Sequence, residues 1–363
     1  MVYITCHFYK LTEKTDRNSL LPYLCRQMHK CWLLYLLCCC LACTKPRPIT
    51  RAFYFWKQRY QPDSTELHTL NALSVQKLYV KMFDVTLAAG KHTAVPVARL
   101  EQRSPFPAGI QVMPTVFIVN DVWQQVNADT LARQVAQLLA KTSPQQAGEV
   151  QIDCDWTRNS KTAYFAFLQS LRRQPFMQGK QLSVTIRLHQ VKFLASSGAP
   201  PADKGLLMCY NMGNLRQYGD HNSILNMNDL ESYAGSKRIV HYPLSLDLAL
   251  PLFRWSVLFR RHSYAGLLRN LEENDFSNHR IFSKNGEQLY TVLKDTVVKG
   301  YPLHAGEEVR YETCPPALLW DAARYLAKQR QDYNPVVIFY HLDENELNKY
   351  ALPELEKTYR ILR

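Results

Sequence analysis

Short apolar runs alternate along this chain with segments of helical periodicity. The runs predict strands over residues 52–56, 78–84, 115–120, 150–155, 182–188, 205–211, 246–253 and 336–340. Between them, apolar side chains recur on one helix face, as at Leu131, Val135, Leu138 and Leu139. Because alternating strands and helices form parallel βαβ units, this order predicts the α/β class and a (β/α)8 TIM barrel.

One segment, from about residue 274 to residue 312, interrupts this alternation. It carries Asn285-Gly286 between two apolar runs, which is a strong hairpin signal. It falls between the seventh predicted strand and a helix that Pro315-Pro316 begins. We therefore expect a small α+β insertion after the seventh strand, forming one wall of a cleft.

Polar side chains occupy every second position on the fourth and fifth predicted strands. The rows are Gln151, Asp153 and Asp155, and then Ser183, Thr185, Arg187 and His189. Barrel strands are covered by helices outside, so we expect both polar rows to point into the lumen. Neighbouring strands would then place the two aspartates near Arg187 and His189.

Further polar and aromatic residues fall at strand ends, where TIM barrels hold their active sites. The polar ones are Asp84, Asn120, Asp155, His189, Asn211, His341 and Asp343, and the aromatic ones are Trp56, Tyr210, Trp255 and Tyr340. Flat aromatic faces there suit stacking against a sugar ring. The alternatives are a buried ion-pair network without chemistry and aromatic side chains that belong to the core.

The cysteines are concentrated at the N-terminus, where seven of the ten lie at or before position 43. The uncharged run over residues 31–42 follows His29 and Lys30 and is too short to span a bilayer. Its length is typical of the apolar region of a signal peptide. It ends in Leu41-Ala42-Cys43, with a small residue directly before the cysteine.

This ending resembles a bacterial lipoprotein signal. The resemblance implies a leader over residues 1–43, lipidation of Cys43, export, and an anchor in the cell envelope, with residues 44–363 as a single barrel domain. We expect the natural start at Met28; the alternative for the apolar run is a buried Cys-rich helix. The remaining cysteines, Cys154, Cys209 and Cys314, make no disulfide framework and no metal-ligand spacing, so neither a metal nor a cofactor is expected.

Composition narrows the class of partner only slightly. With 47% hydrophobic and 21% charged residues, the 363-residue chain is neither disordered nor fibrous. Its net charge of +13 permits contact with anionic surfaces. No basic run with interleaved aromatics is present, so nucleic acid is not expected as a partner, and a monomer is the expected state.

Around QIDCDW at 151–156, and across most of the chain after Cys43, the sequence resembles two groups of proteins. One is a group of Bacteroidota lipoproteins that share FYFWK, QIDCDWT, TIRLHQ, GLLMCYNMGN and FYHLD; it implies no activity. The other, more distant, is glycoside hydrolase family 18, whose fourth strand ends in Asp-x-x-Asp-x-Asp-x-Glu. Asp153 and Asp155 match the second and third acids, and Met208 to Tyr210 match a sixth-strand motif.

Two positions depart from the family 18 pattern. Val150 replaces the first acid, and Thr157 replaces the glutamate that would protonate the glycosidic oxygen. A threonine cannot act as a general acid near neutral pH.

Three functions therefore stay open. The first is a glycan-hydrolysing domain with Asp155 as leading acid/base, Asp153 as its electrostatic partner and Tyr210 as a stabiliser of developing charge. The second is a glycan- or peptidoglycan-binding lipoprotein that has lost the acid. The third is a barrel hydrolase or lyase that acts on something other than glycans, which the basic net charge allows. In the first two, the expected substrate contacts are Trp56, Asp84, Arg187, His189, Asn211, Trp255, His341 and Asp343.

Overall fold

The computed structural model describes residues 47–90, 93–331 and 333–363. Pro48–Arg363 form one compact unit. The predicted leader, its start at Met28 and the lipidation site Cys43 lie outside the described residues. No helix in the described part of the chain has the length and apolar character needed to cross a membrane.

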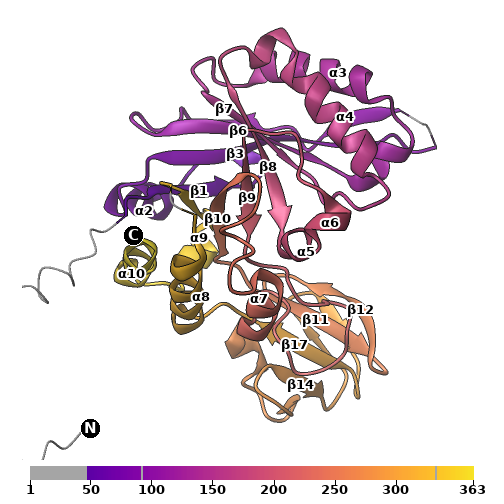
Figure 1. The fold of residues 1–363 in the computed structure, drawn as a ribbon. Helices are drawn as coiled ribbons and strands as arrows, with labels where there is room; N and C mark the ends of the chain where they lie inside the picture. Colours follow the sequence, from indigo (N-terminus) through magenta and orange to yellow (C-terminus); the bar gives the residue numbers. More distant parts are fainter. Residues whose placement is uncertain (1–46, 91–92, 332) are drawn as a thin grey trace, which may run out of the picture. The chain divides into compact units, whose positions relative to one another are not determined.

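In the described chain, eight parallel strands close into a barrel (Figure 1). Around the barrel they are β1 (Thr50–Phe55), β3 (Lys77–Leu87), β6 (Gln111–Ile118), β7 (Glu149–Asp153), β8 (Gln181–Arg187), β9 (Lys204–Met208), β10 (Ser245–Pro251) and β18 (Val336–Tyr340). Closure comes from β1, which pairs with β18 on one side and with β3 on the other. The predicted (β/α)8 barrel is confirmed.

Helices follow most of the strands. They are α2 (Ser64–Ala72), α3 (Ala128–Thr142), α4 (Lys161–Arg172), α5 (Leu188–Lys192), α6 (Leu194–Ser197), α7 (Met227–Ala234), α8 (Pro316–Gln329), α9 (Glu344–Leu347) and α10 (Leu352–Leu362), with 3-10 turns η1 (Asn120–Gln124) and η2 (Pro175–Met177). Local sequence signals determine where several of these helices begin. Asp63 and Glu66 form a reciprocal capping box at α2, and Pro316 begins α8.

The connection from β3 to β6 differs from the other connections between barrel strands, which contain helices. Its described residues form β4 (Ala94–Val97), which pairs antiparallel with β3, and β5 (Glu101–Gln102), which pairs with β2 (Arg59–Tyr60). No helix forms in the described part of this connection, so β4 lies beside α3 on the outside of the barrel.

The insertion after β10 is built around a five-stranded antiparallel sheet. Its elements are β11 (Trp255–Arg260), β12 (Ser263–Leu268), η3 (Glu273–Phe276), β13 (Phe282–Lys284), β14 (Leu289–Val292), β15 (Thr296–Val298), β16 (Tyr301–Leu303) and β17 (Glu308–Glu312). The predicted Asn285-Gly286 hairpin joins β13 to β14 and is confirmed. The sheet begins at Trp255, earlier than the predicted boundary near 274, because the apolar run of β10 leads almost directly into β11.

The insertion has its own apolar core and is tied to the barrel by a buried arginine. Arg310, fully buried, lies 2.6 Å from Glu312 and donates hydrogen bonds to the carbonyls of Leu215, Gln217 and Gly219. Those carbonyls belong to the connection between β9 and α7. In Figure 1 the insertion sheet accordingly lies next to α7, away from α3 and α4.

Candidate functional site

The polar rows of β7 and β8 meet inside the barrel, as predicted. The Thr185 hydroxyl donates to Oδ1 of Asp153 at 2.7 Å, and the Gln151 amide donates to Ser183 at 3.4 Å. Tyr54 of β1 donates to the Gln151 carbonyl oxygen from across the lumen. The period of two along each strand therefore does separate the lumenal row from the row facing the helices.

Asp153 is a buried carboxyl beside a second carboxylate. Burial, with a further contribution from the negative charge of Asp155, raises the pKa of Asp153 to about 7. The hydrogen bond from Thr185 and the charge of Arg187 act in the opposite direction. Near neutral pH this carboxyl is therefore divided between its protonated and ionised forms.

Asp155 lies just beyond the end of β7, and its side chain is 50% exposed. Its Oδ2 is 2.9 Å from Nη1 of Arg187. The other arm of the Arg187 guanidinium donates to the main-chain carbonyl of Asn211 at 3.2 Å. The predicted proximity of the aspartates to Arg187 is confirmed.

His189 does not continue the lumenal row, and this prediction was wrong. Strand β8 ends at Arg187, and His189 falls in α5 with an exposed side chain. The alternation of faces ends where the chain turns into a helix.

Three other strand-end residues have local partners. Asp84 forms an ion pair of 3.0 Å with Lys81, whose ammonium lies 5.6 Å from the ring centre of Trp56. Asp343 caps α9 by accepting from the amide of Asn345 at 3.0 Å. Asn120 begins η1 and accepts from Ser160 at 2.6 Å.

A cavity of about 820 Å³ opens between these strand ends and the insertion. Trp56, Asn211, Tyr340 and His341 line it from the barrel, and Trp255 lines it from the insertion together with residues 267–272. We call this cavity the cleft. The prediction that the insertion forms one of its walls is confirmed.

The predicted site residues divide into two groups around this cleft. Those that line it are Trp56, Asn211, Trp255 and His341. Those outside its lining are Asp84, Asp153, Asp155, Arg187, His189, Tyr210 and Asp343. The lumenal carboxyls and the cleft are thus neighbouring features rather than one site.

Aromatic rings form the floor of the cleft: Trp56, Phe253, Trp255 and Tyr340 line it, and Tyr210 packs against Tyr340 from outside the lining. The ring centres of Trp56, Tyr210 and Phe253 lie 5.3–5.6 Å from that of Tyr340. Trp255 extends the group through Phe253, with 5.2 Å between ring centres. Trp56, Tyr340 and Trp255 are only partly buried and therefore offer ring surface to a ligand.

The cleft also holds an ion-pair cluster that the sequence did not indicate. Arg254 lies 2.6 Å from Glu272 and 2.7 Å from Glu346, and all three line the cavity. Burial raises the pKa of Glu346 to about 7, against the attraction of Arg254. In the sequence, only the position of Arg254 directly after the seventh predicted strand could have indicated this cluster. Glu272 and Glu346 come from remote segments and carry no such signal.

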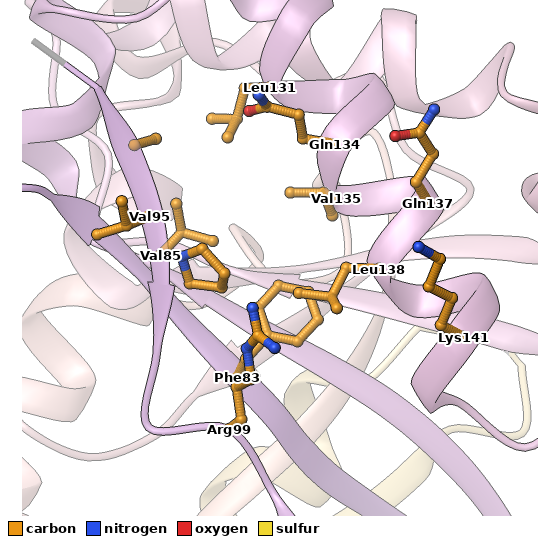
Figure 2. A pocket seen from close by; sticks show the side chains of 12 residues that line it. Phe83, Val85, Val95, Arg99, Leu131, Gln134, Val135, Gln137, Leu138 and Lys141 are labelled. Atoms are coloured by element: carbon orange, nitrogen blue, oxygen red, sulfur yellow. The ribbon is translucent and has the colours of Figure 1, made fainter.

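A second cavity, of about 260 Å³, lies on the outer wall between β4 and α3, where the barrel lacks a helix (Figure 2). Its walls are mainly apolar, with Phe83, Val85, Leu131 and Val135 lining them. Its charged lining residues, Arg99 and Lys141, are both cations. None of its lining residues belongs to the cleft or to the lumenal polar rows, so this cavity is not the candidate site.

No group of three or more His, Cys, Asp or Glu side chains is arranged to hold a metal within the described residues. Cys154, Cys209 and Cys314 are buried free thiols. Cys154 accepts a hydrogen bond from the indole of Trp123 at 3.2 Å, on the helix side of the barrel.

No protein-family model and no curated protein matches this chain. Among solved structures, the C-terminal domain of a candidate chitinase from Desulfitobacterium hafniense is similar, at 12% identity and a TM-score of 0.50 over 87% of this chain and 100% of that one. A chitinase from Chromobacterium violaceum is 13% identical over 83% of this chain and 97% of that one, with a TM-score of 0.48. The Bacillus cereus spore cortex-lytic enzyme SleL is 11% identical over 88% of this chain and 74% of that one, with a TM-score of 0.49.

At this level of identity, the likeness to the Desulfitobacterium domain shows the fold alone. The chain is a TIM barrel with the architecture of that domain.

Proposed function

We propose that this chain is a glycan-binding barrel that holds a saccharide in the cleft. The observation that carries the proposal is the aromatic floor around Tyr340, open to a cavity of about 820 Å³. Aromatic faces stack on the C–H faces of sugar rings, while polar side chains at the rim fix their orientation. Asn211, Arg254 and His341 supply such polar groups.

Binding without cleavage is favoured by the surroundings of Asp153, Asp155 and Thr157, three of the positions that match acids of the family 18 pattern. Thr157 is exposed, and its amide donates to Ser160 at 2.9 Å just before α4. Asp155 is engaged by Arg187, and neither Asp155 nor Asp153 lines the cleft. A general acid must reach the glycosidic oxygen, and no carboxyl at these positions faces the cavity.

One observation favours hydrolysis as the second candidate. The raised pKa of Asp153, about 7, leaves a partly protonated carboxyl two residues from Asp155. Tyr210 contacts the cleft floor through Tyr340 and would stabilise charge on a sugar that reached this pair. In this alternative Asp155 acts as acid/base with Asp153 as its electrostatic partner.

We further propose that the protein is exported and anchored in the cell envelope through a lipid on Cys43. The support is the sequence Leu41-Ala42-Cys43 after an uncharged apolar run, and the resemblance to Bacteroidota lipoproteins. Labelling with a clickable fatty acid in cells tests it, with Cys43→Ser as the variant that loses the label. Equal labelling of Cys43→Ser would contradict the anchor.

The glycan experiment uses the wild type beside Asp155→Asn. Both are incubated with envelope glycans and with plant and fungal polysaccharides, and retention and released reducing ends are measured in parallel. We expect retention of both proteins on at least one glycan without products. Products from the wild type alone would establish the hydrolase instead, and retention on none would refute glycan binding.

A further inference from the structure

Four buried polar atoms without a hydrogen-bond partner belong to residues that line the cleft. They are Oδ1 of Asn211, Nε of Arg254, Nε1 of Trp255 and Nδ1 of His341. Buried polar atoms in native proteins are nearly always paired, because an unpaired one has lost its hydrogen bonds to water without replacement. Their gathering around one cavity indicates where a polar ligand makes its contacts.

The chemistry of these atoms limits what the ligand can be. Indole and guanidinium nitrogens only donate, so Arg254 and Trp255 both require an acceptor such as a hydroxyl or carboxylate oxygen. Asn211 Oδ1 requires a donor, which a sugar hydroxyl provides. Burial lowers the pKa of His341 to about 4, so its ring is neutral near pH 7 and adds no charge to the cleft.

The charge balance of the lining supplies the second, independent observation. Lys57 pairs with Glu66 and Asp343, Lys299 pairs with Asp275, and Arg254 pairs with both carboxylates of the lining. The Arg269 guanidinium, exposed in the same lining, has no acidic partner among residues 47–90, 93–331 and 333–363. Its charge therefore remains available to a ligand.

Arg269 acts directly on the floor of the cleft. It follows the last residue of β12 on the insertion side, and its positive charge tends to lower the pKa of Tyr340, opposing the effect of burial. Because Arg269 and Tyr340 line the same cavity, the guanidinium is placed to contact a substituent on a sugar stacked on that ring.

From these contacts we propose that the cleft selects acidic glycans, binding a uronic-acid-type sugar over Tyr340 with its carboxylate on Arg269. The planar guanidinium matches a carboxylate in a two-pronged geometry. Trp255 and Arg254 donate to oxygens of the same ligand, and Asn211 accepts from a hydroxyl. This inference rests on the proposed glycan binding and specifies its ligand.

The test is calorimetric titration of the full chain with three matched oligosaccharides: oligogalacturonate, its neutral galactose counterpart and a sulfated galactan. We expect oligogalacturonate to bind about fivefold more tightly than the neutral sugar, the upper end for an exposed ion pair. Added salt should narrow this difference, because salt screens exposed charges.

The variant Arg269→Gln should abolish the preference for oligogalacturonate, lowering its affinity to about that of the neutral sugar. Arg280→Gln is the matched control, since Arg280 is an exposed arginine of the insertion outside the cleft lining. Trp255→Phe removes one donor and should weaken binding of both sugars.

The outcomes separate the two proposals. Equal affinity for acidic and neutral sugars overturns the acidic preference and leaves glycan binding standing. Tighter binding of the sulfated galactan than of oligogalacturonate overturns the assignment to a carboxylate. A preference that survives in Arg269→Gln overturns the role of Arg269, and absence of binding to all three sugars counts against glycan binding itself.

Discussion

The guanidinium of Arg187 lies 2.9 Å from the carboxylate of Asp155, and its other arm donates to the Asn211 carbonyl. One side chain therefore links the end of β7 to the end of β9. Asn211 adopts a left-handed backbone conformation, with φ of 52°, which asparagine tolerates better than most residues. The ion pair thus holds Asp155 beside the lumen while Asn211 lines the cleft.

Asp153 should make the stability of the fold depend on pH. Its folded-state pKa of about 7 lies above the value near 4 in an unfolded chain, so the folded state binds more protons between these values. The contribution of Asp153 to the free energy of unfolding is fully present below about pH 4 and is lost as the pH rises through 7. Asp153→Asn should remove this loss, so between about pH 4 and pH 8 its free energy of unfolding should gain about 4 kcal/mol relative to that of the wild type.

Urea unfolding of wild type and Asp153→Asn across this pH range measures the difference. Asp121→Asn is the matched control, because Asp121 is an exposed aspartate that has no part in the electrostatics of Asp153. Parallel pH curves for wild type and Asp153→Asn would contradict the raised pKa.

Lys204 is expected to be essential for stability at the opposite end of the barrel. Its ammonium lies 2.7 Å from Asp247 and 2.9 Å from Glu149, both buried carboxylates. Lys204→Met leaves these charges without their main partner and should lower the free energy of unfolding by about 3–5 kcal/mol. Denaturant unfolding measures this loss, with Lys237→Met as the control because Lys237 is exposed. Equal losses of unfolding free energy in the two variants would refute the prediction.

Trp56 should carry a large share of the affinity for a glycan. It lines the cleft and packs against Tyr340, with ring centres 5.6 Å apart. Trp56→Ala removes this stacking surface and should weaken binding about tenfold. Titration with a glycan measures the effect. Phe193→Ala is the control, because it removes an exposed ring outside the cleft lining. A thermal melt checks that both variants fold. Unchanged affinity in a folded Trp56→Ala protein would exclude the cleft as the binding site.

Arg310 should hold the connection between β9 and α7 in place. Its guanidinium satisfies three carbonyls of that connection from within the insertion. Arg310→Met leaves these carbonyls without their donor and buried Glu312 without its cation, with only Ser223 still donating to it, so amide exchange over residues 213–223 should accelerate. Hydrogen exchange measured by mass spectrometry tests it, with exposed Arg260→Met as control. The same protection in both variants would show that the arginine is dispensable.

Local sequence determined the elements of this protein and their order. The alternation of apolar runs and helical faces predicted the eight barrel strands, and Asp63 with Glu66 predicted the start of α2. Asn285-Gly286 predicted a hairpin that is present. The lumenal placement of Gln151 and Asp153 also followed from sequence, because side chains on a strand alternate with a period of two. These features depend on residues close together in the chain.

The tertiary structure alone decided which residues share the cleft. Arg254, Glu272 and Glu346 meet because the insertion folds back over the barrel, and no local pattern encodes that packing. Asp343 and His189 lie outside the cleft lining for local reasons, because Asp343 caps α9 and His189 falls in α5 directly after β8 ends. A strand-end position predicts nearness to a site, but closure of the barrel and docking of the insertion determine which side chains line it.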